Sequence, residues 1–370
     1  MNRSPGMDIV RVAAIGLVMV AHGTFLAIDA HPELRYLSFA FGSLGVEIFF
    51  VLSGFLIGHQ LLDVSEKTQS VGAFWARRWL RTLPCYYLFL LVNAAIYPAL
   101  GREGEASTAY LLFAQNLVQP FQGAFFGESW SLAVEEWFYL LAPLFIVCAA
   151  RVPYCKRDPV IASMLVLITA SNVARFALAW QSEMPIDSGL RKVVAIRLDA
   201  LAWGVLLAWL SVNRRHAFAA LSNHAWVGFV LAGCCCGAIA WWTTDMRIMR
   251  APSGFDRILA PLVFAALPFA LAILVAWFHE KNWPARTWIL HHSRIAYSMY
   301  LLHIPLVLVM LAANGSYGKW WTFVPAFVIW YGATAFLATI VYWYYEKPIM
   351  DLRERFVPRP PRAESKGAYG

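Results

Sequence analysis

Residues 257–278 read RILAPLVFAALPFALAILVAWF, and this stretch decides the class of fold. It carries one charged residue, Arg257. A helix of about 20 such residues crosses a hydrocarbon layer roughly 30 Å thick. Because lipid offers the backbone no hydrogen-bond partners, an apolar stretch of this length spans a membrane as a helix. The sequence therefore predicts an all-α integral membrane protein.

Similar stretches recur along the chain, in which 60% of the residues are hydrophobic and 14% are charged. Soluble domains carry about 25% charged residues. We predict about ten transmembrane helices in a domain covering residues 1–350, followed by a polar, disordered tail at 351–370. Segment 107–126 is semi-polar and is expected to be a loop helix on or in the membrane surface. The expected helices are 9–28, 43–60, 79–98, 129–149, 159–180, 193–211, 225–243, 257–278, 294–312 and 320–345.

Lysine and arginine are distributed unevenly over the two sets of loops. One side receives more than twice as many as the other, including the clusters at 77–78, 156–157 and 214–215. Positive charge marks cytoplasmic loops, so both termini are predicted to be cytoplasmic. The net charge of +8 is spread through these loops instead of forming a patch, which argues against nucleic-acid binding. No CxxC pair occurs, so no metal site is expected.

The first helix carries ionisable residues that are costly inside a bilayer and are therefore functional candidates. Arg11 and His22 are 11 residues apart, which places them within roughly 20° of the same helix face and about 16 Å apart. Asp8 lies on the same side. The simpler interpretation is that Arg11 reaches towards the membrane surface and His22 bonds across helices.

The fourth helix begins SWSLAVEEWFYLLAPL, and Ser131, Glu135 and Tyr139 in it follow at four-residue intervals. This spacing predicts one polar stripe. Glu136 points about 100° away from it. Glu135 should pair with His22 or an arginine, and a purely structural bridge between helices is the alternative.

Arginines crowd the start of the third helix, in FWARRWLRTLP. Positive-inside anchoring explains Arg77 well, whereas Arg81 lies a full turn deeper than Arg77 and Arg78. Arginine binds phosphate through a planar fork of donors, so a phosphorylated donor is plausible here. Arg197 and Asp199 open the sixth helix; at this spacing they do not face each other, and each needs its own partner.

Taken together, these segments resemble the acyltransferase-3 family of bacterial membrane O-acyltransferases. The resemblance runs from Asp8 to Met350 and follows the family's order of motifs. One departure is Glu47, where the family often has Asp. The motifs are Arg-x10-His at Arg11 and His22, GVEIFFVLSGFLI at 45–57, RRWLRTLP at 77–84, SWSLAVEEWFYLLAPL at 129–144, RLDALAWG at 197–204, SRIAYSMYLLHIPL at 293–306 and YEKP at 345–348.

The resemblance implies a multi-pass protein of the bacterial inner membrane that takes part in O-acetylation of surface polysaccharides. It implies acetyl-CoA or another acyl-CoA as a cytoplasmic co-substrate, no bound cofactor, and a glycan or glycolipid acceptor. Catalytic roles would fall to His22, Arg11 and Glu135, and donor binding to Arg78 and Arg81. The supporting residues would be Ser131, Tyr139, Asp8, Glu47, Arg197, Asp199 and His303. A multi-span transporter or flippase is the alternative function.

Two roles for His22 fit this chemistry: general base on the acceptor hydroxyl, or nucleophile forming an acyl-imidazole. Glu135 is expected to orient its ring, as a carboxylate does in a catalytic triad. His303 is the competing candidate for the base. We expect a cavity that runs from the cytoplasmic arginines past His22 to the outer face near Glu135.

Overall fold

The computed structural model describes residues 4–102, 107–121, 123, 125–181 and 183–357, and this part of the chain contains helices and no strands. Nine of its helices are long and apolar enough to cross a membrane. They are α1 (Pro5–Gly23), α2 (Leu34–Ser65), α3 (Val71–Ala99), α4 (Ser129–Ala149), α5 (Pro159–Gln181), α8 (Ala225–Thr243), α9 (Asp256–Glu280), α10 (Thr287–Asn314) and α11 (Trp320–Val341). The expectation of an all-α, multi-pass membrane protein is confirmed.

The sixth expected helix, 193–211, is shorter than predicted. It appears as α6 (Leu198–Asn213), whose 16 residues fall just below the usual length of a span. Residues 193–197 instead form a connection with a short 3-10 turn, and the backbone N–H of Val194 donates to the carbonyl of Asn116. This pairing with a distant loop makes the helix begin later than expected.

Segment 107–126 is not the loop helix that was expected. Its described residues contain only the 3-10 turn Thr108–Leu112. The buried Asn116 side chain donates to the carbonyls of Trp130, at 3.0 Å, and Lys192, at 2.6 Å. These side-chain bonds hold the segment as an ordered loop against the start of α4.

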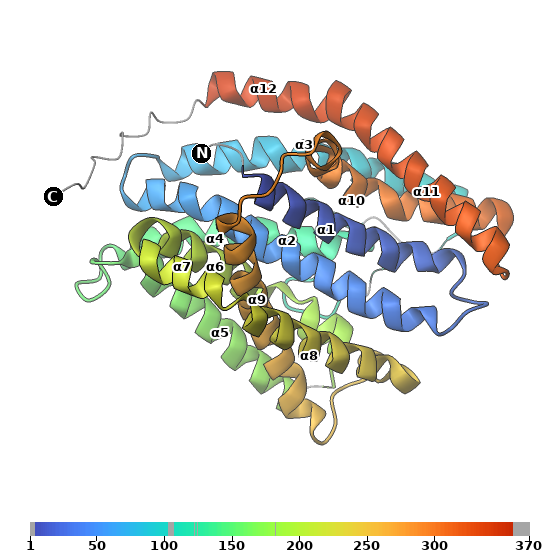
Figure 1. The fold of residues 1–370 in the computed structure, drawn as a ribbon, viewed down its shortest axis with the longest axis horizontal. Helices are drawn as coiled ribbons and strands as arrows, with labels where there is room; N and C mark the ends of the chain where they lie inside the picture. Colours follow the sequence, from blue (N-terminus) through green and yellow to red (C-terminus); the bar gives the residue numbers. More distant parts are fainter. Residues whose placement is uncertain (1–3, 103–106, 122, 124, 182, 358–370) are drawn as a thin grey trace.

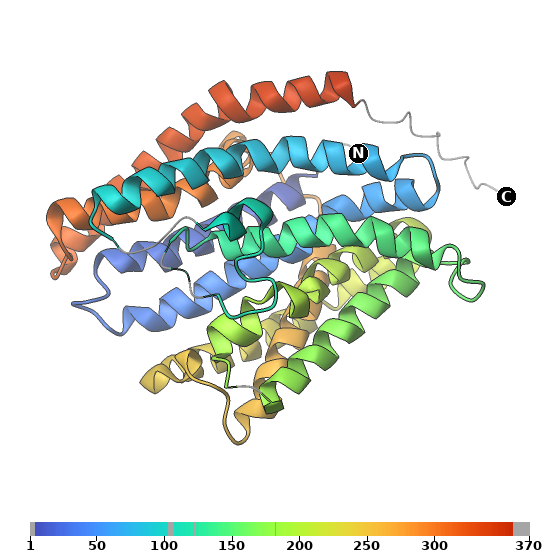
Figure 2. The ribbon, with the colours of Figure 1, turned by 180° about the vertical axis from the view of Figure 1, so that it is seen from behind.

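The long helices run side by side, with α1, α2 and α6 in the middle of the bundle (Figures 1 and 2). Helices α2 and α6 approach closely at Gly54 and Gly204. A Cβ on Gly54 would lie 2.1 Å from the carbonyl oxygen of Leu201, and one on Gly204 would lie 2.2 Å from that of Val51. Small residues of this kind allow membrane helices to pack backbone to backbone.

The start of α1, the turn 66–70 between α2 and α3, and the loop 150–158 between α4 and α5 lie at one end of the bundle (Figure 1). We call this the N-terminal end. The connection between α1 and α2 and the turn between α10 and α11 lie at the other end, called the opposite end. The last described helix, α12 (Lys347–Phe356), also ends at the N-terminal end.

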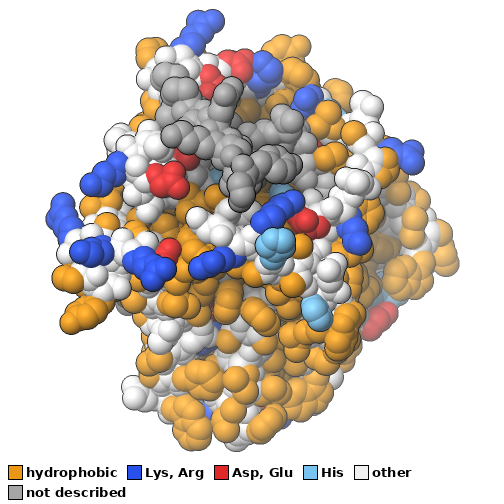
Figure 3. Space-filling view, turned by 60° about the vertical axis from the view of Figure 1, so that its left-hand side comes forward, with side chains coloured by type: hydrophobic (Ala, Val, Ile, Leu, Met, Phe, Trp, Pro, Cys, Tyr) orange, Lys and Arg blue, Asp and Glu red, His pale blue; other side chains and the backbone are white. Residues whose placement is uncertain are grey.

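Viewed from the side of the N-terminal end, blue Lys and Arg side chains lie across the upper part of the surface, and the lower part is mostly hydrophobic (Figure 3). Large apolar side chains point outwards from several helices, as lipid-facing residues do; examples are Leu91, Val173, Trp226, Val328 and Phe336. Residues 351–356, expected to be part of a disordered tail, belong to α12, and residues 358–370 lie outside the described residues.

Candidate active site

A cavity of about 580 Å³ enters the bundle from the N-terminal end. Exposed Arg294 is one of its lining residues, so the cavity reaches the surface there. Its inner end is lined by Ser131 and Tyr300. Arginines outnumber carboxylates on the wall, which favours an anionic ligand. The charged lining residues are Arg11, Arg77, Arg78, Arg81, Arg294 and Arg353 with Asp8, Asp63 and Glu135.

The predicted stripe on α4 is present: Ser131, Glu135 and Tyr139 all line this cavity, and Glu136 is not among the lining residues. The Tyr139 hydroxyl donates to Glu135 Oε2 at 2.9 Å. The Ser53 hydroxyl lies 2.6 Å from the Tyr139 oxygen and therefore donates to it, since the single Tyr139 proton is already used. Glu135 is thus held in a polar chain at the cavity wall.

Glu135 faces arginines and not His22. The Arg78 guanidinium lies 5.0 Å from the centre of the Tyr139 ring, and Arg78 and Arg81 are both close enough to Glu135 to act on its charge. The hydrogen-bond partner of the His22 ring is His303. The expectation that Glu135 orients His22 therefore has no support in the geometry.

The three arginines of α3 have different surroundings. Arg77 is buried; it donates to the Glu354 carboxylate at 2.7 Å and to the carbonyl of Val357, so it ties α12 to α3. Arg78 and Arg81 are half-buried on the cavity wall. Anchoring at the membrane surface is therefore an incomplete explanation for Arg77, because this side chain also makes a specific contact between helices.

Arg11 lies at the same cavity, near its mouth. Its Nη1 donates to Ser293 Oγ at 2.9 Å, and Ser293 donates to Asp8 Oδ1 at 2.6 Å. Arg11 and Asp8 also form an ion pair at 3.6 Å. The predicted grouping of Asp8 and Arg11 on one face is confirmed, and Ser293 of α10 completes it.

His22 lies beyond the inner end of the cavity and is not one of its lining residues. Its Nδ1 is 2.8 Å from Nε2 of His303, and the His303 ring centre is 5.5 Å from that of Tyr300. The expected continuous channel past His22 is therefore not what the cavity shows: Ser131 and Tyr300, whose hydroxyls are 2.7 Å apart, line it, whereas His22 and His303 do not. His303, a sequence candidate for the base, is the link between Tyr300 and His22.

A second group of charges approaches His22 from the segment before α6. Asp187 lies 2.5 Å from both Arg191 and Lys192, and the Arg191 guanidinium is 4.8 Å from the Trp130 ring centre. Arg191 and Lys192 are close enough to His22 to act on its charge. Burial raises the pKa of the Asp187 carboxyl, but the two cations outweigh it and hold the pKa at about 2.

Sequence reasoning assigned Arg191 and Lys192 only to an outer loop. The available signal was a charged pair four and five residues after Asp187, within the otherwise apolar stretch around PIDSGLRKVVAI. At that spacing a single turn of helix brings the acid to both bases. The turn is the π-helical segment Ile186–Arg191.

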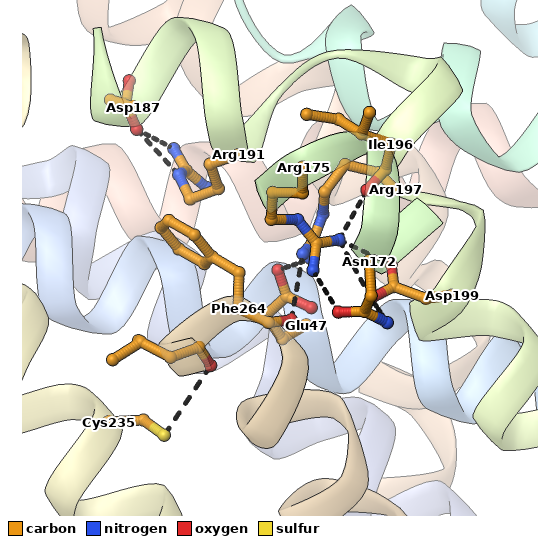
Figure 4. Close-up of polar contacts among 11 residues, drawn as sticks. Glu47, Asn172, Arg175, Asp187, Arg191, Ile196, Arg197, Asp199, Cys235 and Phe264 are labelled. Atoms are coloured by element: carbon orange, nitrogen blue, oxygen red, sulfur yellow. Dashed lines mark hydrogen bonds and ion pairs between the residues drawn. The ribbon is translucent and has the colours of Figure 1, made fainter. Parts of the chain in front are cut away.

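Four charges form a buried network between α2, α5 and α6 (Figure 4). Arg197 pairs with Glu47, and Arg175 pairs with Asp199 at 2.9 Å; all four side chains have no solvent exposure. The prediction that Arg197 and Asp199 need separate partners is confirmed. None of the four lines the cavity, so they act on the packing of the helices that surround it.

Within the described ranges, no group of three or more His, Cys, Asp or Glu side chains is placed to hold a metal ion. The arrangement instead offers a basic cavity, a carboxylate with hydroxyl partners, and a paired imidazole. These are groups for binding an anionic ligand and for moving a proton.

Comparison with known proteins adds the family. YrhL of Bacillus subtilis (strain 168), provisionally named a peptidoglycan O-acetyltransferase, is 25% identical over 93% of this chain. The peptidoglycan O-acetyltransferase OatA of Listeria monocytogenes is 32% identical over 39% of the chain, and the O-acetyltransferase OatA of Staphylococcus aureus is 30% identical over 38%. The chain spans 54% of YrhL and 24% of each OatA protein. No solved structure was found to match.

The family model described as an acyltransferase domain matches residues 4–343, which is nearly all of the described bundle. This match includes the α4 stripe, the histidine pair and every lining residue of the cavity except Arg353. The chain therefore belongs to the acyltransferase-3 family.

Proposed function

We propose that this protein is a membrane O-acyltransferase that moves an acyl group, in the simplest case acetyl, from acyl-CoA to a hydroxyl of a glycan or glycolipid. The observation that carries the proposal is the basic cavity that leads from the N-terminal end of the bundle to within one side chain of the His303–His22 pair. Membership of an acyltransferase family supports the type of reaction.

The donor would enter at the N-terminal end, which we infer to be cytoplasmic from the distribution of Lys and Arg in the sequence. Coenzyme A carries phosphate groups at one end and the thioester at the other. Arg78 and Arg81 would hold phosphate through charge-assisted hydrogen bonds. The thioester would then lie towards Ser131 and Tyr300, where the cavity ends.

His22 would act as the general base. Its imidazole takes the proton of the acceptor hydroxyl while the hydroxyl oxygen attacks the thioester carbonyl carbon. The carbon–sulfur bond breaks, and the proton passes to the leaving sulfur, which departs as the free thiol of coenzyme A. Arg191 and Lys192, both near His22, would stabilise the negative charge that develops on the carbonyl oxygen.

The acceptor would approach from the opposite end of the bundle. His22 lies near that end of α1, and Trp130, which contacts Arg191, could stack on a sugar ring. The relatives named as peptidoglycan O-acetyltransferases make peptidoglycan fragments the first acceptor to test. The acceptor side would thus differ from the donor side.

The test is acyl transfer by the purified full chain in lipid nanodiscs, supplied with radiolabelled acetyl-CoA and peptidoglycan fragments. We expect labelled fragments and release of coenzyme A thiol, both abolished in His22→Ala. The matched control is His224→Ala, because His224 is an exposed histidine whose ring hydrogen-bonds to the carbonyl of Ala220, four residues earlier. Transfer that survives His22→Ala would contradict the proposal.

A transporter or flippase is separated by the same preparation. It would move a labelled glycolipid between the leaflets without consuming acetyl-CoA. This movement would not depend on acetyl-CoA either in the wild type or in His22→Ala. If wild-type protein moves the lipid but produces neither labelled fragments nor free thiol with acetyl-CoA present, the acyltransferase proposal is wrong.

A further inference from the structure

Three groups form a chain through the interior of the bundle. Nδ1 of the His303 ring lies 2.6 Å from the backbone carbonyl oxygen of Tyr300, and its Nε2 lies 2.8 Å from Nδ1 of His22. The two imidazole rings lie 4.9 Å apart at 29° to each other. Among the described residues, every ring nitrogen of His303 and His22 has a hydrogen-bond partner except Nε2 of His22.

The proton positions in the chain follow from its first contact. A backbone carbonyl has no proton to give, so Nδ1 of His303 must carry the proton of that bond. If Nδ1 were unprotonated, two lone pairs would face each other at 2.6 Å. His303 is therefore protonated at Nδ1.

A doubly protonated His303 is ruled out by its surroundings. The side chain has no solvent exposure, and among the described residues it hydrogen-bonds to a backbone carbonyl and to another histidine, not to a carboxylate. A cation buried without a counter-ion is strongly disfavoured, more so in a membrane protein. The neutral ring has its lone pair on Nε2, which accepts from His22.

We propose that His303 is a positioning residue that holds His22 in the tautomer protonated at Nδ1, and thereby makes Nε2 of His22 the atom that takes the proton in acyl transfer. The second half of this inference rests on the proposed function. The arrangement has the logic of a catalytic triad, with a neutral histidine and a peptide carbonyl in the place of the carboxylate. It assigns to His303 a role that needs no contact with either substrate.

Contacts between the surrounding helices hold this hydrogen-bonded chain of side chains in place. The Trp330 indole N–H of α11 donates to the His303 carbonyl at 3.0 Å and fixes this turn of α10. Gly23, next to His22, allows α1 to approach α11: a Cβ there would lie 2.3 Å from the Phe327 ring. The histidine pair is therefore held by three helices and not by a mobile loop.

The direct test is nitrogen NMR of the full chain labelled with 15N-histidine in nanodiscs, where ring couplings distinguish the two neutral tautomers. The His22 signals are assigned by their loss in His22→Gln. We expect the Nδ1–H form in the wild type and a shift towards Nε2–H in His303→Leu. His303→Gln should keep the Nδ1–H form, because its amide oxygen can accept the same bond. An Nε2–H His22 in the wild type would overturn the inference.

Kinetics supply the second readout. His303→Leu should lower kcat by about 10- to 100-fold, the range seen when a partner that orients a histidine is removed from a metal site. The KM for acyl-CoA should not change, and His303→Gln should recover most of the rate. The control is His291→Leu, on the same helix but bonded to Thr339 of α11, which should keep the wild-type rate. Equal losses in the Leu and Gln variants would show that His303 only maintains packing.

The two proposals fail separately. A wild-type protein that shows the Nδ1–H form of His22, lost in His303→Leu, but no acyl transfer would remove the proposed function and leave the tautomer assignment standing. Acyl transfer that depends on His22 but is unchanged in His303→Leu would leave the proposed function standing and remove the positioning role of His303.

Discussion

Removing one member of the buried Glu47–Arg197 pair should destabilise the protein far more than removing both. Glu47→Gln takes away the carboxylate that faces the Arg197 guanidinium. Arg197 then keeps a 3.3 Å hydrogen bond to the Phe264 carbonyl and the Phe264 ring, whose centre is 5.7 Å from its guanidinium, and its Nε has no hydrogen-bond partner among the described residues. The variant would hold an uncompensated cation with no solvent exposure.

The magnitude follows from that burial. Breaking a buried ion pair by removing one partner costs about 3–5 kcal/mol, because the remaining charge stays desolvated. Glu47→Gln and Arg197→Met should each lose free energy of unfolding in this range. The double variant removes both charges and should lose less than either single variant, so the coupling energy should exceed about 3 kcal/mol.

The assay is SDS-induced unfolding of the purified protein in mixed micelles, followed by far-UV circular dichroism for the four corners of the cycle. The control pair is Lys347–Asp351, which is also in close contact, at 2.5 Å, but has side chains 39% and 61% exposed. Asp351→Asn should cost less than about 1 kcal/mol, as exposed pairs do. Glu47→Gln and Arg197→Met losses that simply add in the double variant would refute the reasoning.

Three further predictions concern the cavity and its surroundings. Arg81→Ala should raise the KM for acyl-CoA much more than the KM for the acceptor, with partial recovery in Arg81→Lys, since an ammonium cannot form the bidentate fork; equal changes in both constants would mean that Arg81 only supports the fold. Arg77→Ala should expose α12 to limited proteolysis, because it removes the contacts to Glu354 and Val357; an unchanged cleavage pattern would argue against this anchor. Glu128, 3% exposed and just before α4, has its pKa raised by burial from 4.5 to about 8. The folded state therefore keeps a proton that the unfolded chain releases above pH 4.5, so stability should fall as pH rises from about 4.5 to 8 and then level off. The thermal midpoint of Glu128→Gln, measured over the same range, should lack this slope.

Much of the architecture was predictable because lipid imposes a simple rule on sequence. A long apolar stretch must become a helix, so nine of the ten expected segments appear as long helices near their predicted positions. The exceptions have tertiary causes. Helix α6 begins late because residues 193–197 bond to a loop more than 70 residues away, and 107–126 is a loop because Asn116 bonds to the start of α4 and to Lys192.

The candidate site divides in the same way. Residues on a single helix were grouped correctly, as with Asp8 and Arg11 on α1 or Ser131 and Tyr139 on α4, because helical spacing fixes which side chains share a face. Helical spacing also predicted that Arg197 and Asp199 do not pair with each other. It could not identify their partners, which come from α2 and α5.

The sequence by itself thus determined the membrane class, the long helices, the family resemblance and the residues that lie together on one helix. Only the tertiary structure decided that Glu135 faces Arg78, that His303 of α10 bonds to His22 of α1, and that Arg191 and Lys192 approach the same histidine. The physical reason is that periodicity specifies the direction of a side chain on its own helix. The partner it meets depends on how helices distant in sequence pack against each other.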